Sequence, residues 1–147
     1  MTRAQAERAA PAGYTSSVNP TVYVVEPQAL FGPKLARLVT DAGGRVAGTA
    51  SALDLDAIIA AKPQAVLLDL DFTAYDVADA LDVLRSEAPA VRTIVLTAER
   101  GAGWLERCRD AGAASVVSKS VTEEELVHDL RVVLDGGAVW DIRVEAC

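Results

Sequence analysis

Short apolar runs and longer amphipathic segments alternate five times along residues 21–136. Because the apolar runs have strand length and are bounded by Gly, Pro or charged residues, we expect five strands. They cover residues 21–26, 45–50, 65–71, 91–96 and 114–118. The segments between and after them place apolar residues at helical spacing, which predicts five helices. These cover residues 28–42, 51–61, 76–88, 101–110 and 122–135.

Alternation of strand and helix predicts parallel strands joined by right-handed crossovers, with helices on both faces of one sheet. Five such units in about 116 residues have the size of a flavodoxin-like domain, a three-layer (βα)5 sandwich with strand order 2-1-3-4-5. We expect this domain to span residues 21–136. Residues 1–20 are expected to form a disordered tail, briefly helical around Ala4–Ala9, and residues 137–147 a C-terminal extension.

Capping residues indicate where several of the helices begin and end. Ser51 and Thr122 stand at N-cap positions, and Glu125 lies three residues after Thr122, as in a capping box. Gly136 and the glycine after it end the last helix, because glycine accepts the left-handed conformation common at helix C-termini.

Composition narrows the class of protein. The chain has 147 residues, of which 51% are hydrophobic and 24% charged, so one domain with a substantial core is expected. The net charge of −7 argues against a nucleic-acid surface, which is usually basic. Cys108 and Cys147 lack metal-ligand spacing, which favours a reducing, cytoplasmic compartment. No apolar run approaches the roughly 18–20 residues of a membrane helix.

Polar residues follow four of the five predicted strands. Since the carboxyl ends of parallel strands meet at one edge of a sheet, we expect these side chains to lie together. They are Glu26, Asp69 with Asp71, Thr97 and Lys119. The set suits phosphoryl transfer: a carboxylate can attack phosphorus, two acids can hold Mg²⁺, and a hydroxyl and an ammonium can bind phosphoryl oxygens. Asp69, at the end of the most buried strand, is the candidate nucleophile.

The motifs VLLDLD at 66–71, IVLTA at 94–98 and AGAASVVSKS at 111–120, with QALF at 28–31, resemble a known family. It is the receiver domain of two-component response regulators, nearest to receivers that precede a LuxR-type helix-turn-helix. The resemblance implies a phosphoacceptor, a switch hydroxyl, an invariant-type lysine and Mg²⁺ ligands. By this resemblance, Asp69 is the phosphoacceptor, Thr97 the switch hydroxyl and Lys119 the invariant-type lysine. Glu26, Asp69 and the backbone carbonyl of Asp71 are the Mg²⁺ ligands.

Three positions depart from the family pattern. Pro27 replaces the second of two adjacent acids, which is expected to weaken the Mg²⁺ site, and the Asp71 side chain is a candidate replacement. Ser120 follows the lysine where many receivers carry proline, so we expect a trans peptide bond there. Val116 stands where many receivers carry a switch aromatic, so an aromatic flip coupled to Thr97 is not expected.

As a receiver, the chain is expected to accept a phosphoryl group on Asp69 from a histidine kinase or phosphotransfer protein. It would catalyse its own phosphorylation and dephosphorylation without being a turnover enzyme. Output is expected through a protein partner on the face around residues 98–135, or through an effector domain outside this chain, with no direct nucleic-acid contact. Family behaviour also suggests a homodimer through the last helices.

Two alternatives remain open at this point. A degenerate receiver would serve as a binding module that does not depend on phosphorylation. Alternatively, residues 69–73 resemble the DxDx[TV] motif of haloacid-dehalogenase-type phosphatases, with Thr97 and Lys119 in the next two positions and Asp135 and Asp141 as metal acids. Against the phosphatase, its motif belongs on the first strand, whereas here it follows the third.

Overall fold

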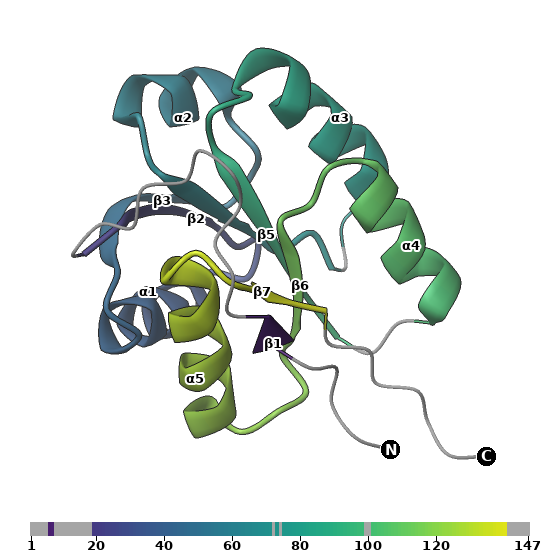
Figure 1. Ribbon diagram of the computed structural model, residues 1–147. Helices are drawn as coiled ribbons and strands as arrows, with labels where there is room; N and C mark the ends of the chain where they lie inside the picture. The colour runs from purple at the N-terminus through teal and green to yellow at the C-terminus, as the bar shows by residue number, and fades with distance from the viewer. Residues whose placement is uncertain (1–5, 8–18, 72, 74, 99–100, 141–147) are drawn as a thin grey trace.

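The computed structural model describes residues 6–7, 19–71, 73, 75–98 and 101–140. Its centre is a five-stranded parallel sheet in the order β3-β2-β4-β5-β6 (Figure 1). The strands are β2 Thr21–Val25, β3 Arg45–Ala50, β4 Ala65–Leu68, β5 Arg92–Thr97 and β6 Ser115–Ser118. Numbered within the sheet, this is the predicted order 2-1-3-4-5, and the flavodoxin-like architecture is confirmed.

Helices cover both faces of the sheet (Figure 1). They are α1 Gly32–Asp41, α2 Leu55–Ala61, α3 Val77–Glu87, α4 Ala102–Asp110 and α5 Glu123–Leu134. The central strand β4 divides its side chains between two cores, since alternate residues of a strand point to opposite faces. Leu67 packs with the α1 and α5 side chains, whereas Val66 and Leu68 pack with those of α2, α3 and α4.

Several helix boundaries differ from the sequence prediction. The second helix begins at Leu55 with Asp54 as its N-cap, rather than at Ser51, because the Asp54 carboxylate accepts a 3.1 Å hydrogen bond from the Ala57 amide. The first helix begins at Gly32, since Gln28 closes a turn before it by accepting from the amides of residues 31 and 32. The Thr122 cap and the Gly136 stop are confirmed, the latter at φ 100°.

The two ends of the described chain meet beside β6. Strand β1, Ala6–Glu7, pairs antiparallel with β7, Ala138–Val139, so the expected helix around residues 4–9 is wrong at these two positions. Pairing supplies backbone hydrogen bonds across strands, whereas a helix this short does not stabilise itself. The rest of that expected helix lies outside the described residues.

Strand β7 also packs against the sheet. The Val139 amide donates a 3.1 Å hydrogen bond to the Ser115 hydroxyl of β6, and the Val139 side chain is fully buried. The next residue, Trp140, forms a parallel bridge to Val116 and lies under the Arg109 guanidinium, 4.7 Å from the ring centre. Residues 138–140 therefore run along β6. In the described part of the chain, no helix is long and apolar enough to cross a membrane.

Candidate functional site

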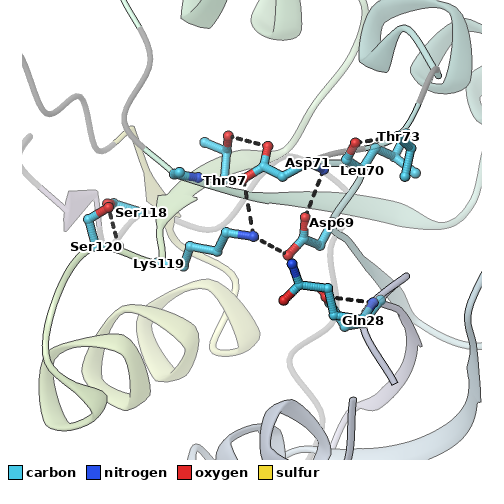
Figure 2. A network of polar contacts seen from close by, with 11 residues as sticks. Gln28, Asp69, Leu70, Asp71, Thr73, Thr97, Ser118, Lys119 and Ser120 are labelled. Atoms are coloured by element: carbon cyan, nitrogen blue, oxygen red, sulfur yellow. Dashed lines mark hydrogen bonds and ion pairs between the residues drawn. The ribbon is translucent and has the colours of Figure 1, made fainter. Parts of the chain in front are cut away.

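The five predicted site residues lie at the carboxyl edge of the sheet, and Figure 2 shows four of them together: Asp69, Asp71, Thr97 and Lys119. Glu26 follows β2, Asp69 and Asp71 follow β4, Thr97 ends β5, and Lys119 follows β6. All except Lys119 are buried, and the Lys119 side chain is only 15% exposed. The parallel sheet thus brings together residues that are up to 93 positions apart in sequence (26 to 119).

Asp69 lies in the centre of this cluster and is completely buried. Its Oδ2 forms an ion pair with the Lys119 Nζ at 2.7 Å, and its Oδ1 accepts a hydrogen bond of 2.9 Å from the Asp71 amide. The second contact closes a local turn and fixes the carboxylate at the strand end. Lys119 therefore places a positive charge directly beside the candidate nucleophile.

Asp71 accepts hydrogen bonds from three donors. The Thr97 hydroxyl donates to its Oδ1 at 3.0 Å, the Ala98 amide donates to its Oδ2 at 2.7 Å, and the Lys119 Nζ lies 3.1 Å from the same Oδ2. Burial works to raise the pKa of Asp71, but the Ala98 amide and Lys119 outweigh it, so this pKa lies below its ordinary value. These donors direct the Asp71 carboxylate toward Thr97 and Lys119, and its role as a replacement for the missing acid stays a hypothesis.

Glu26 has a different environment. Its Oε1 accepts a 3.1 Å hydrogen bond from the Gln28 amide, whereas its buried Oε2 accepts none within the described residues. Burial, followed by the neighbouring Asp69 carboxylate, raises the pKa of Glu26 to about 8. A buried carboxylate oxygen without a donor, beside a second carboxylate, fits an oxygen-seeking cation such as Mg²⁺.

The acidic set around that position is small. Pro27 offers no side-chain ligand. Among the described residues, no group of three or more His, Cys, Asp or Glu side chains surrounds a shared cation position. Glu26 and Asp69 are the candidate side-chain ligands for a cation, and the backbone carbonyl of Asp71 is a further candidate.

Lys119 connects Asp69 with Asp71. Burial works to lower the pKa of its ammonium, but the hydrogen bonds and charges of the two aspartates raise this pKa above its ordinary value. The peptide bond before Ser120 is trans, as predicted, since no cis bond occurs in the described residues. The strand before the lysine has the small, buried Val116 at the position where many receivers carry a switch aromatic.

The match to known families covers most of this structure. The model of the response regulator receiver domain matches residues 22–131, from the first strand of the sheet into α5. The chain belongs to the receiver family. Receivers are signalling domains of two-component systems rather than turnover enzymes. The family match gives no support to the phosphatase alternative, and Asp135, one of its required acids, is the C-cap of α5. Asp141, the other, lies outside the described residues.

One curated relative of this chain is a transcriptional regulatory protein. The transcriptional regulatory protein MctR of Rhizobium johnstonii is 30% identical over 97 residues, which are 65% of this chain and 45% of that protein. The chain therefore spans less than half the length of the curated relative it matches.

Solved receiver structures share the fold at lower identity. The receiver domain of NarL from Mycobacterium tuberculosis is 24% identical with a TM-score of 0.70, over 82% of this chain and 99% of that one. A LuxR-family two-component response regulator from Aurantimonas sp. SI85-9A1 is 23% identical with a TM-score of 0.72, over 82% and 89%. At these identities the likeness concerns the fold alone.

Proposed function

We propose that this receiver accepts a phosphoryl group on Asp69 from the phosphohistidine of a histidine kinase or phosphotransfer protein. The observation that carries the proposal is the position of Asp69 at the end of the central strand, with the Lys119 Nζ 2.7 Å from its Oδ2. Thr97, at the end of the adjacent strand, supplies a hydroxyl on the same edge. Together they provide a nucleophile, a cation and a hydrogen-bond donor for the transferred group.

In the transfer, one Asp69 carboxylate oxygen forms a bond to phosphorus as the phosphorus–nitrogen bond to the donor histidine breaks. The bonding electron pair leaves with the imidazole, which then takes up a proton. The residues that would hold Mg²⁺ are Glu26, Asp69 and the backbone carbonyl of Asp71. The chemistry that Mg²⁺ supplies when bound is neutralisation of negative charge on the phosphoryl oxygens. Pro27 leaves this set one carboxylate short of the usual acidic pair.

The phosphorylated receiver would act on a protein partner. The face around residues 98–135, which includes α4, β6 and α5, is the proposed output surface because Thr97 and Lys119 lie at its inner edge. Movement of these two residues toward a phosphoryl group would shift the segments that follow them. A homodimer through the last helices is the corresponding proposal for assembly.

Intact mass tests the phosphoryl acceptor directly. The protein is incubated with acetyl phosphate and Mg²⁺, which also tests whether it catalyses its own phosphorylation, and then treated with hydroxylamine. We expect a gain of one phosphoryl group that hydroxylamine removes, as for an acyl phosphate. Asp69→Asn should lose this gain, whereas Asp79→Asn, at an exposed position of α3, should keep it. Full labelling of the Asp69→Asn protein would overturn the assignment.

A further inference from the structure

The Asp71 carboxylate has surroundings that a turn residue does not require. Its donors come from two other strand ends: the Thr97 hydroxyl and the Ala98 amide after β5, and the Lys119 ammonium after β6. The turn itself is already closed without the Asp71 side chain. The Asp71 amide donates to Asp69, and the Thr73 amide and hydroxyl donate to the Leu70 carbonyl. The convergence on this side chain therefore needs another explanation.

These donors are the ones that the proposed function assigns to a phosphoryl group. A phosphoryl group on Asp69 needs a hydroxyl, an ammonium and backbone amides for its oxygens, since charge-assisted hydrogen bonds are the strong ones. Thr97 and Lys119 provide the first two, and the Ala98 amide, adjacent to Thr97, provides the third. Figure 2 shows Thr97 and Lys119 directed at the Asp71 carboxylate from neighbouring strand ends. The Asp71 carboxylate thus offers two anionic oxygens to the same hydrogen-bond donors that a phosphoryl group on Asp69 would use.

We propose that the Asp71 carboxylate occupies the hydrogen-bond donors that would bind the phosphoryl oxygens, for as long as Asp69 is unmodified. This inference rests on the proposed function, since it assigns regulation of the same site. Two consequences follow. Thr97 is already drawn toward the site before any phosphoryl transfer, so the unphosphorylated chain holds this residue close to its signalling position. A phosphoryl group on Asp69 must displace the Asp71 carboxylate, which makes the modification slower than at a site with free donors.

The first test uses unphosphorylated, metal-free protein, so it does not depend on the proposed chemistry. Amide NMR spectra are compared for wild type, Asp71→Ala, Asp71→Asn and the exposed-acid control Asp79→Ala. In Asp71→Ala the Ala98 amide proton should move upfield and exchange faster with solvent, because it loses a charged acceptor. Added acetate should reverse this shift in a saturable manner by filling the vacated position, and should leave wild type unchanged.

Asp71→Asn separates the effect of the negative charge at this position from the effect of the side chain's shape. Its amide oxygen can still accept from one donor but no longer attracts Lys119, so the Ala98 shift should be intermediate. This variant also decides the question if Asp71→Ala fails to fold. If the Ala98 amide signal keeps its wild-type chemical shift in either folded variant, the inference is wrong. It is also wrong if the signal shifts but acetate has no effect on it.

The second test measures the rate of phosphorylation by acetyl phosphate with Mg²⁺. Asp71→Ala leaves the backbone carbonyl in place and should be phosphorylated about tenfold faster than wild type, the equivalent of one net charge-assisted hydrogen bond. An equal or lower rate in the variant would overturn the displacement step while leaving the Asp69 assignment intact. If no variant and no wild-type protein is phosphorylated, the proposed function fails, and the NMR comparison still decides whether Asp71 holds the donors.

Discussion

Replacing Glu26 with glutamine should stabilise the metal-free protein, although it removes an acid that we assign to the Mg²⁺ site. The reason is the crowding of two buried carboxylates. With burial and Asp69 raising its pKa to about 8, Glu26 is protonated in the folded protein at neutral pH, whereas in the unfolded chain it ionises near 4.5. A glutamine keeps the acceptor oxygen for the Gln28 amide and carries no ionisable proton.

The size of the effect follows from proton linkage. Between pH 4.5 and about 8 the folded state binds one more proton at Glu26 than the unfolded state, so this residue lowers stability as the pH rises through that window. At pH 7, about 2.5 units above the ordinary pKa, the loss is about 3 kcal/mol at 1.4 kcal/mol per unit. Glu26→Gln should therefore gain about 3 kcal/mol at pH 7 and almost nothing near pH 4.5.

The assay is urea denaturation followed by tryptophan fluorescence, with a chelator present, at several pH values from 4.5 to 8.5. The quantity of interest is the difference in free energy of unfolding between Glu26→Gln and wild type at each pH, because groups that do not interact with Glu26 contribute equally in both proteins. Glu106→Gln, an exposed acid on α4, serves as the matched control and should show no such trend. A Glu26→Gln difference that does not grow with pH would refute the reasoning. With Mg²⁺ the difference should shrink, since the glutamine variant lacks one carboxylate ligand.

Three further substitutions test other parts of the account. Pro27→Asp should tighten Mg²⁺ binding in a calorimetric titration, because it restores an adjacent acid; an unchanged affinity would mean that Pro27 does not limit the site. Arg92→Ala should cost about 2 kcal/mol in urea denaturation, because Arg92 donates hydrogen bonds of 2.8 and 2.9 Å to the carbonyls of Val133 and Gly137 at the end of α5. Thr122→Ala should cost about 1 kcal/mol by removing the N-cap of α5, and a loss near zero would show that neighbouring contacts hold this helix start.

The fold was predictable because the hydrophobic pattern identifies the strands and helices, and their alternation along the chain indicates one sheet topology. The apolar runs fix the strands, and the alternation with helices restricts them to one parallel arrangement. Boundaries were less predictable. Ser51 and Asp54 are equally suitable caps by residue type, and only the position of the Ala57 amide in three dimensions selects Asp54. The strand at Ala6–Glu7 could not be read from its own residues, since it depends on a partner more than 130 positions away (6 to 139).

The residues of the candidate site were predictable from the sequence, but the hydrogen bonds and ion pairs between them were not. Parallel topology places the ends of four strands at one edge, so Glu26, Asp69, Thr97 and Lys119 could be grouped from the sequence alone. The direction of the Asp71 side chain could not, because both the metal side and the Thr97 side were within reach of a residue at that position. Which donors it meets depends on how β5 and β6 lie beside β4, and this is tertiary information.

The segment at residues 138–140 makes the two borders of the sheet unequal. At β6, the outer border is taken up by the chain itself, through the bridge to Trp140 and the hydrogen bond from Val139 to Ser115. At the opposite border, β3 is the outermost strand of the sheet, and its side chains alternate between exposed and half-buried. Exposed strand borders are where separate chains join into aggregates. In this protein, unwanted strand-to-strand association is therefore directed to β3, and polar or charged substitutions there should protect the protein at high concentration.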